Sequence, residues 1–380
     1  MKRLVVFCDG TWNRMSSEHP TNVLLGTQLV LPRDSAGHEQ VVYYDEGVGT
    51  SYTVSQKFET LLAGMFGLGL VSKIEAAYRF LIFNYEPGDE IFIFGFSRGA
   101  FTARSLAGLL RKCGIIPKSH ARKIGEVFAF YKDAGTHPDS DEARRRRMEW
   151  CPDIILKEAD RGWQIAHGAD RARAEAAVPL AIKYLGVWDT VGALGVPHHL
   201  FVSPFLNRKR HEFHDTELSS TVLSARHAVA VDEERLSFAP ALWSNVDELN
   251  ERAGGMGKYQ QLWFPGDHGS VGGGGDVKGL SDSSLAWIME GAQAEGLAVN
   301  EPALLTLKGG ADHWAALANV SKKPGFLDQI IFRRAPRKGP QQKGLLSESA
   351  TARLYDEQKS GLPPYRPKTL ERLWPPGLSK

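Results

Sequence analysis

The sequence predicts an α/β fold in which a mostly parallel central sheet is wrapped by helices, with a helical insertion and a C-terminal tail. Short apolar runs of strand length alternate with longer segments of helical periodicity, which is typical of a parallel sheet with helices on both faces. Apolar residues make up 42% of the 380 residues and charged residues 24%, a composition that supports a substantial core. Two regions depart from the alternation and predict the insertion and the tail.

Five runs rich in β-branched and aromatic residues have the length of buried strands. They are Leu4–Cys8, Gln40–Tyr44, Ile91–Phe96, Ile182–Trp188 and Tyr259–Phe264. Helical faces are predicted for Lys73–Asn84 and Phe101–Leu110, where apolar residues recur every three or four positions. A third helix is predicted over Leu218–Val231, although His227–Val231 could instead form a strand.

Residues 118–178 are charged and helical in pattern, with an unbroken basic run at Arg144–Arg147. We interpret this region as an insertion or cap over the sheet; its basic run would either meet anionic headgroups or form a solvated helix face. From about residue 333 the chain is rich in Pro, Lys and Arg, which predicts a surface-wrapping tail. The predicted organisation is a catalytic domain over residues 1–332 and a tail over 333–380.

Several classes of protein are disfavoured by composition. The formal net charge of +2 gives no global field for nucleic acid, and no nucleic-acid partner is expected. Cys8, Cys113 and Cys151 have neither zinc-ligand nor disulfide spacing, and Cys8 and Cys113, which lie inside apolar runs, are expected to be buried. The apolar run 4–8 is too short for a signal-peptide core, and no run approaches the roughly 20 residues of a membrane span. We expect a cytoplasmic protein at synthesis, with signal-independent secretion left open.

The most specific motif is Gly95-Phe-Ser97-Arg-Gly99. The apolar strand 91–96 leads directly into it and a helical pattern follows at once. This context is typical of the nucleophile elbow of α/β hydrolases, where a strained turn exposes the serine hydroxyl and the helix N-terminus faces the developing oxyanion. Side chains at positions 95 and 99 would clash with the neighbouring helix and strand. The sequence therefore predicts an α/β-hydrolase fold with Ser97 as the nucleophile.

A serine nucleophile needs a histidine base and a carboxylate that orients it, and in α/β hydrolases the acid precedes the histidine. Asp189 directly follows strand 182–188, and His268 follows strand 259–264 in a glycine-rich turn. Both lie at strand ends, where open parallel sheets place their sites. Asp232 is the alternative acid if 227–231 is a strand. His198 and His199 are weaker candidates for the base because they come too soon after Asp189 to have a strand of their own. His227 lies on a predicted helix face, and His313 follows no clear strand.

The oxyanion donors are expected to be the amide of Arg98 and a second amide from Gly10 or Thr11, in the turn after the first strand, with Asp9 as a supporting residue. Phosphatases of the haloacid type also carry Asp-Gly-Thr after a hydrophobic strand. Their nucleophilic aspartate lies two positions earlier, where this chain has Phe7.

No metal site or cofactor is expected, because no group of His, Cys and Asp has metal-ligand spacing. The run Gly272–Gly275 lacks the Gly-Lys-Ser or Gly-Lys-Thr of a phosphate loop. We interpret it as close packing around His268.

Ten segments together resemble one known family. They are Leu4–Asn13, Gly47–Thr50, Ala77–Phe80, Tyr85–Ala100, Trp188–Gly192, Asp232–Arg235, Pro265–His268, Gly272–Gly274, Leu280–Asp282 and Tyr365–Lys368. The family is the α/β-hydrolase domain family that includes the phospholipase effectors of bacterial type VI secretion systems. The resemblance implies a Ser–Asp–His hydrolase of lipid esters and carries onto Ser97, Asp189 and His268. Members usually have an aspartate two positions after this histidine, where this chain has Ser270.

The predicted function is hydrolysis of carboxylic esters, with phospholipid favoured by the resemblance alone. The alternatives are a small-molecule esterase and a non-catalytic interaction protein on a hydrolase scaffold. The expected partners are a lipid or ester substrate, a transient membrane surface, and a secretion-system or immunity protein.

Overall fold

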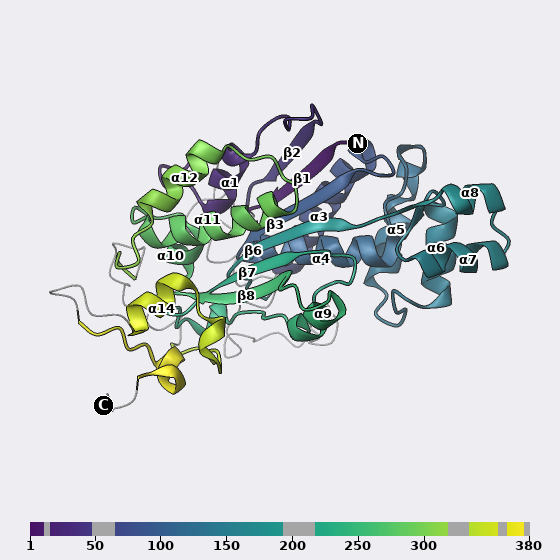
Figure 1. Cartoon of the computed structure of the whole chain (residues 1–380). Helices are drawn as coiled ribbons and strands as arrows, with labels where there is room; N and C mark the ends of the chain where they lie inside the picture. The colour runs from purple at the N-terminus through teal and green to yellow at the C-terminus, as the bar shows by residue number, and fades with distance from the viewer. Residues whose placement is uncertain (11–15, 48–64, 193–216, 318–333, 356–362, 376–380) are drawn as a thin grey trace.

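The computed structural model describes the chain except for residues 11–15, 48–64, 193–216, 318–333, 356–362 and 376–380 (Figure 1). At its centre lies a six-stranded sheet in the order β2-β1-β3-β6-β7-β8, in which every neighbouring pair is parallel. The strands are β1 (Arg3–Cys8), β2 (Gln40–Asp45), β3 (Glu90–Phe96), β6 (Ile182–Trp188), β7 (Ala225–Ala230) and β8 (Tyr259–Phe264). The predicted α/β class is confirmed, and the five predicted strands end within one residue of their expected bounds.

Helices cover both faces of the sheet because its strands are apolar on both sides. In β1, Leu4 and Val6 enter one core, whereas Val5 and Phe7 enter the other. The first core is closed by α3 (Met65–Asn84), α4 (Arg98–Cys113) and α9 (Val246–Arg252). The second is closed by α1 (Asn22–Leu29), α10 (His268–Gly272), α11 (Gly279–Ala294) and α12 (Glu301–Gly310), which lie together in Figure 1. Cys8 and Cys113 are buried, as predicted, and so is Cys151.

The predicted helix over Leu218–Val231 is wrong, and the alternative, a strand in its second half, is confirmed. Residues Ala225–Ala230 form β7, which pairs with β6 on one side and β8 on the other. The alanines of this segment favour a helix intrinsically, but β7 is buried on both faces between two strands, and small side chains fit that position. Tertiary pairing therefore overrides local propensity here.

The insertion lies between α4 and β6 and is made of short elements. They are η1 (Lys118–Lys123), α5 (Ile124–Lys132), α6 (Asp141–Trp150), β4 (Ile154–Ile155), α7 (Glu158–Ala166), α8 (Arg171–Ala176) and β5 (Val178–Pro179). It packs on the C-terminal end of α4, where Cys113 Sγ contacts the carbonyl oxygen of Val127. Since α4 runs for 16 residues, about 24 Å, the insertion lies at the end of the sheet away from Ser97 (Figure 1). The described insertion is therefore not a cap over Ser97.

The tail packs against the carboxyl ends of β7 and β8. Its elements are η5 (Lys343–Leu345), α14 (Glu348–Tyr355) and η6 (Lys368–Leu373). Leu346 pairs with Trp263 in an isolated parallel bridge. A third apolar cluster joins tail residues such as Leu354 and Leu370 to Val229 and Val231. The tail thus shares a core with the sheet.

Candidate active site

Ser97 occupies a sharp turn between β3 and α4. Its backbone has φ 58° and ψ −123°, a conformation that side chains rarely adopt and that costs of order 1–3 kcal/mol. A Cβ at Gly95 would lie 2.5 Å from the carbonyl oxygen of Gly99, and one at Gly99 would lie 2.1 Å from that of Cys8. The two glycines therefore let α4 start against β1 and β3, as the motif predicts. Ser97 is the N-cap of α4, but its side chain makes no cap hydrogen bond.

Asp189 follows β6, the neighbour of β3 in the sheet. The Ser97 amide donates to the Trp188 carbonyl oxygen at 3.1 Å, which ties the elbow to the residue before Asp189. The Asp189 side chain is fully buried, and its Oδ1 accepts from the Ala230 amide at 2.9 Å. Its φ of 34° is the other positive value among the described non-glycine residues.

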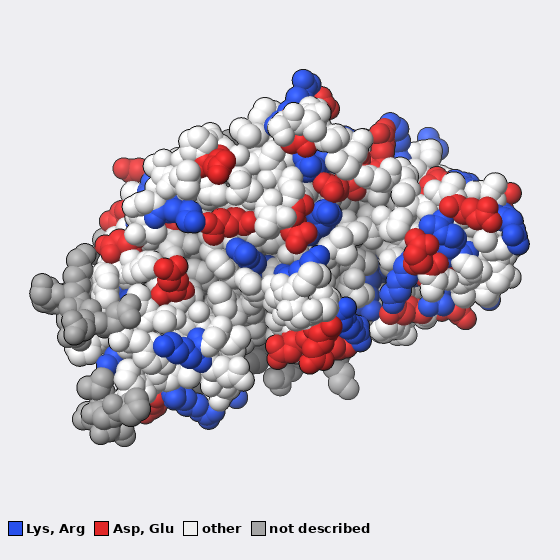
Figure 2. All heavy atoms as spheres, in the orientation of Figure 1, with Lys and Arg blue, Asp and Glu red and all other residues white. Residues whose placement is uncertain are grey.

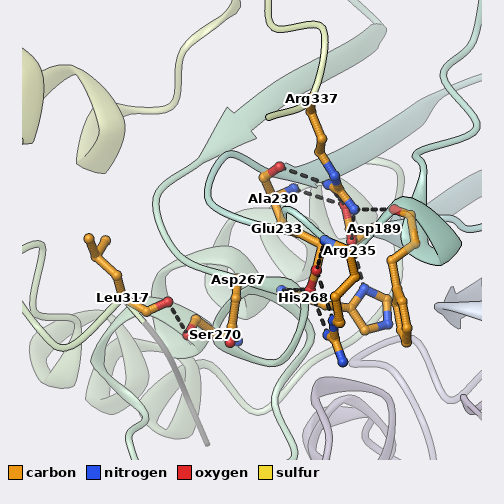
Figure 3. A network of polar contacts seen from close by, with 10 residues as sticks. Asp189, Ala230, Glu233, Arg235, Asp267, His268, Ser270, Leu317 and Arg337 are labelled. Carbon is orange, nitrogen blue, oxygen red and sulfur yellow. Dashed lines mark hydrogen bonds and ion pairs between the residues drawn. The ribbon is translucent and has the colours of Figure 1, made fainter. Parts of the chain in front are cut away.

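His268 begins α10, directly after the turn that follows β8. Its Nδ1 lies 2.6 Å from Asp189 Oδ2, and the pairing places the ring proton on Nδ1 and leaves Nε2 as an acceptor (Figure 3). The imidazole contacts Phe96 with ring centroids 4.5 Å apart and Phe238 with centroids 4.8 Å apart. Because Phe96 precedes Ser97, the ring lies beside the elbow. Among the described residues, none, including His268, forms a hydrogen bond with Ser97 Oγ.

The Asp189 carboxylate is ionised in spite of its burial. Desolvation by itself would raise the pKa of Asp189. The positive charge of Arg337 and the hydrogen bonds from His268 and Arg337 outweigh that effect, and they hold the pKa well below the ordinary value. Asp189 can therefore accept the Nδ1 proton of His268 as a hydrogen bond at any pH near neutrality.

Asp232, the alternative acid, does not contact the imidazole. Its Oδ2 accepts from the Gly266 amide at 2.6 Å and from the Tyr365 hydroxyl at 2.7 Å. Burial is the main reason that the pKa of Asp232 is raised. Asp232 thus anchors the turn that carries His268 to the tail.

The turn around His268 is also fixed by side chains that it carries itself. Asp267 caps α10 by accepting from the Ser270 amide at 2.8 Å. The Ser270 hydroxyl lies 2.9 Å from Asp267 Oδ1 and 3.0 Å from the Leu317 carbonyl oxygen (Figure 3). A Cβ at Gly272 would lie 2.0 Å from the Phe96 ring, so this glycine allows α10 to pack on the residue before Ser97. The interpretation of the glycine run as close packing near His268 agrees with this contact.

The proposed oxyanion loop follows β1, beside the elbow. Asp9 is buried and accepts from the Gly10 amide at 2.6 Å, the Thr21 hydroxyl at 2.6 Å and the Tyr44 hydroxyl at 2.8 Å. The Gly10 N–H is therefore engaged by Asp9 in this structure, and Thr11 lies outside the described residues. Arg98 occupies the first position of α4, and desolvation lowers the pKa of its half-buried side chain to about 10.

Sequence reasoning missed three charged or polar groups near His268. Glu233 is buried, and its Oε2 accepts from the His268 amide at 3.3 Å. Arg235 donates from Nε and Nη2 to the two oxygens of Glu233, and its guanidinium lies 3.9 Å from the centroid of the Phe238 ring. Arg337 contacts Asp189 itself. The segment 232–235 contributes to the family resemblance, but no local pattern marks Arg337.

His227 has a structural place and is not the base. It lies on β7, not on a helix as predicted, and its Nε2 accepts from the Thr190 amide at 3.2 Å while Nδ1 pairs with Gln261 Oε1 at 3.0 Å. Burial lowers the pKa of His227 to about 3, so the ring is neutral. It supports the turn that follows Asp189.

The basic run of α6 is largely paired. Arg147 is buried and donates to the carbonyl oxygens of Arg111, Lys112 and Pro138. Arg144 is half-buried near Asp160, whereas Arg145 and Arg146 are exposed. Figure 2 shows acidic and basic side chains intermixed at this end of the molecule. The run is therefore a partly solvated helix face, and its contacts give no support to the hypothesis that it binds anionic lipid headgroups.

The described residues contain neither a metal-binding cluster nor a membrane-spanning helix. No three side chains of His, Cys, Asp or Glu are grouped there so that they could hold a metal ion. No helix in the same part of the chain is long and apolar enough to cross a membrane.

Comparisons with known proteins identify the family. A family model described as the catalytic domain of Tle1-like phospholipase effectors of the type VI secretion system matches residues 2–291. The uncharacterized protein YEL023C of Saccharomyces cerevisiae is 28% identical over 248 residues, which cover 62% of this chain and 32% of the yeast protein.

Two solved structures are distantly similar. An uncharacterized protein from Pseudomonas aeruginosa has a TM-score of 0.40 and 15% identity, covering 81% of this chain and 48% of that one. The Tle1 effector bound to the VgrG spike of the type 6 secretion system has a TM-score of 0.32 and 17% identity, covering 72% and 51%. The chain thus spans about a third of the yeast protein and about half of each solved chain. Since the family model matches residues 2–291 of 380, this chain belongs to the family of Tle1-like phospholipase effector catalytic domains.

Proposed function

We propose that this chain is a serine hydrolase that cleaves carboxylic esters of phospholipids by acyl transfer to Ser97. The observation that carries the proposal is the contact of 2.6 Å between His268 Nδ1 and Asp189 Oδ2, at a strained elbow that presents Ser97. An ionised carboxylate that holds one histidine tautomer beside a serine hydroxyl is the arrangement of a catalytic triad. Membership of a family of phospholipase effectors supports the ester class and the lipid substrate.

The reaction follows from these positions. His268 Nε2 takes the proton of Ser97 as the hydroxyl oxygen attacks the ester carbonyl carbon, and the imidazolium is stabilised by Asp189. The tetrahedral intermediate collapses, and His268 returns the proton to the departing alcohol. Water then repeats the sequence on the acyl-enzyme, releasing a carboxylic acid and regenerating Ser97. The hydrogen bond between Ser97 Oγ and His268 Nε2 must form in the complex with substrate, as catalytic hydrogen bonds often do.

The oxyanion of the intermediate needs two N–H donors. The amide of Arg98 lies in the first turn of α4, and the N-terminus of a helix favours negative charge. The second donor in the proposal is Gly10 or Thr11. For Gly10 to serve, its N–H must leave Asp9 Oδ1 for the substrate oxygen.

We assign to Arg235 the binding of the substrate phosphate, which would make the enzyme prefer a phospholipid over a neutral ester. Its Nε and Nη2 are held by Glu233, while its Nη1 has no hydrogen-bond partner among the described residues. The guanidinium packs on Phe238, which also contacts the His268 ring. A planar guanidinium edge beside the base is suited to a phosphate oxygen. We also propose delivery by a secretion system and an immunity partner, and membership of the family is the only support for both.

The test is a comparison of wild type with Ser97→Ala on phosphatidylglycerol vesicles and on a short soluble ester. Wild type is expected to release fatty acid and to be labelled by a fluorophosphonate probe. Ser97→Ala should lose labelling and at least about 10³-fold in turnover, keeping only the effects of binding and of the oxyanion donors. Unchanged turnover in the variant would identify another nucleophile. Hydrolysis of the short ester alone would favour the small-molecule esterase.

A further inference from the structure

The guanidinium of Arg337 covers the side of the Asp189 carboxylate that faces away from His268 (Figure 3). Nη1 lies 2.6 Å from Asp189 Oδ1, and Nη2 lies 2.9 Å from Oδ2. The two parallel contacts form the fork by which arginine binds a carboxylate most strongly. With the Ala230 amide and His268 Nδ1, they give each carboxylate oxygen two donors.

Arg337 is itself held in place by the loop that follows β7. Nη1 also donates to the Ala230 carbonyl oxygen at 2.8 Å, and Nη2 donates to that of Phe238 at 2.5 Å. The Ala335 amide donates to Glu234, and Arg334 forms an isolated bridge with Arg235. The Arg337 side chain is 4% exposed, so its charge is shielded little by solvent. A buried arginine with this many fixed partners cannot turn away from Asp189 without leaving them.

We propose that Arg337 is a positioning residue of the active site: its guanidinium fixes the plane of the Asp189 carboxylate, and through that carboxylate it fixes the orientation of the His268 imidazole. The inference rests on the proposed function and extends it to a residue outside the segment 2–291 that the family model matches. Arg337 touches no reacting atom and acts through Asp189.

The experiment compares Arg337→Gln and Arg337→Lys with wild type and with Arg353→Gln, all in the full chain. Arg353 is the matched control, because it is a buried tail arginine that donates to the Ala315 carbonyl oxygen and does not contact Asp189. The measurements are kcat and KM for a short soluble ester and the thermal midpoint of unfolding.

Arg337→Gln is expected to lower kcat about 100-fold while KM stays within about twofold, because the loss is one of orientation. Arg337→Lys keeps the charge without the fork, so it should also lose turnover at a nearly unchanged KM. Arg353→Gln should keep both kcat and KM. Equal effects of the glutamine variants at 337 and 353 would overturn the inference, and so would wild-type kcat in Arg337→Gln.

A second comparison covers the case in which Arg337→Gln folds poorly. In the background of Asp189→Asn, which removes the charge that Arg337 pairs with, adding Arg337→Gln should change kcat by less than about twofold. A further large loss in that background would show that Arg337 acts independently of Asp189 and would overturn the inference. Failure of the proposed function is a separate result, since wild type itself would then show no Ser97-dependent hydrolysis.

Discussion

Gly99→Ala offers a sharp test of the elbow, because two effects of opposite sign compete at this position. Alanine is favoured over glycine inside a helix by about 1 kcal/mol, and Gly99 is the second residue of α4. The added Cβ would lie 2.1 Å from the Cys8 carbonyl oxygen and 2.5 Å from that of Asp9. Real contacts of this kind need more than 3 Å, so the start of α4 and the end of β1 must separate by about 1 Å.

The clash should outweigh the helix preference. Overpacking against backbone costs about 1–3 kcal/mol, and a displacement of about 1 Å between the nucleophile and the oxyanion loop costs about 100-fold in rate. We therefore expect Gly99→Ala to lower the free energy of unfolding by about 1–3 kcal/mol and kcat/KM on a soluble ester by about 100-fold. Urea unfolding and steady-state kinetics measure the two quantities.

Gly162→Ala is the matched control. Gly162 lies inside α7, and a Cβ there would meet no atom within 4 Å. The same substitution should raise the free energy of unfolding by up to about 1 kcal/mol and leave the rate unchanged. If Gly99→Ala proved as stable and as active as wild type, the close approach of α4 to β1 would not be what the elbow requires.

Three further predictions concern groups around the site and the insertion. Arg235→Gln should lower kcat/KM on phosphatidylglycerol about tenfold or more and spare a neutral diacylglycerol; equal losses on both lipids would refute the phosphate assignment. The pKa of buried His227 is lowered to about 3 from 6.5, so the free energy of unfolding should fall as the pH drops below about 6.5, by about 2–3 kcal/mol at pH 4.5. Urea unfolding of His227→Gln should show a smaller loss over the same pH range. Arg147→Gln should destabilise the chain by about 1–3 kcal/mol without weakening vesicle binding, because the Arg147 guanidinium donates to three carbonyl oxygens. A specific loss of vesicle binding in a sedimentation assay would instead support binding of lipid headgroups by the basic run.

The strands and the elbow could be predicted because their signals are local. A run such as Ile91–Phe96 is apolar throughout, and the Gly-x-Ser-x-Gly motif directly follows it. A Cβ at Gly95 would meet Gly99 and Ala100, within a few residues of Ser97, whereas the contacts that require Gly99 are with the distant Cys8 and Asp9. Asp189 and His268 could be chosen because each directly follows a strand, and the sheet order places β6 beside β3. Their mutual contact is a result of the structure.

What could not be predicted depends on distant parts of the chain. The alanine-rich β7 reads as a helix until two partner strands bury it. Arg337 lies 148 residues from Asp189 in a segment whose composition indicates only a surface tail. The location of the insertion follows from the length and direction of α4, which periodicity does not give. The basic run at 144–147 seemed to be one feature, but Arg147 turns inward to carbonyl groups while Arg145 faces water.

The position of Arg337 in the chain has a consequence for biosynthesis. A ribosome completes Ser97, Asp189 and His268 well before it reaches residue 337, and the tail that shares a core with β7 and β8 follows later still. A nascent chain could pair its strands at that stage, but Asp189 would lack the two donors that Arg337 supplies. Under the proposed function and the positioning proposal, full activity against lipid would arise only after residue 337 has been synthesised and the tail has docked, so an earlier nascent chain would be a poor enzyme against the producing cell's own membranes.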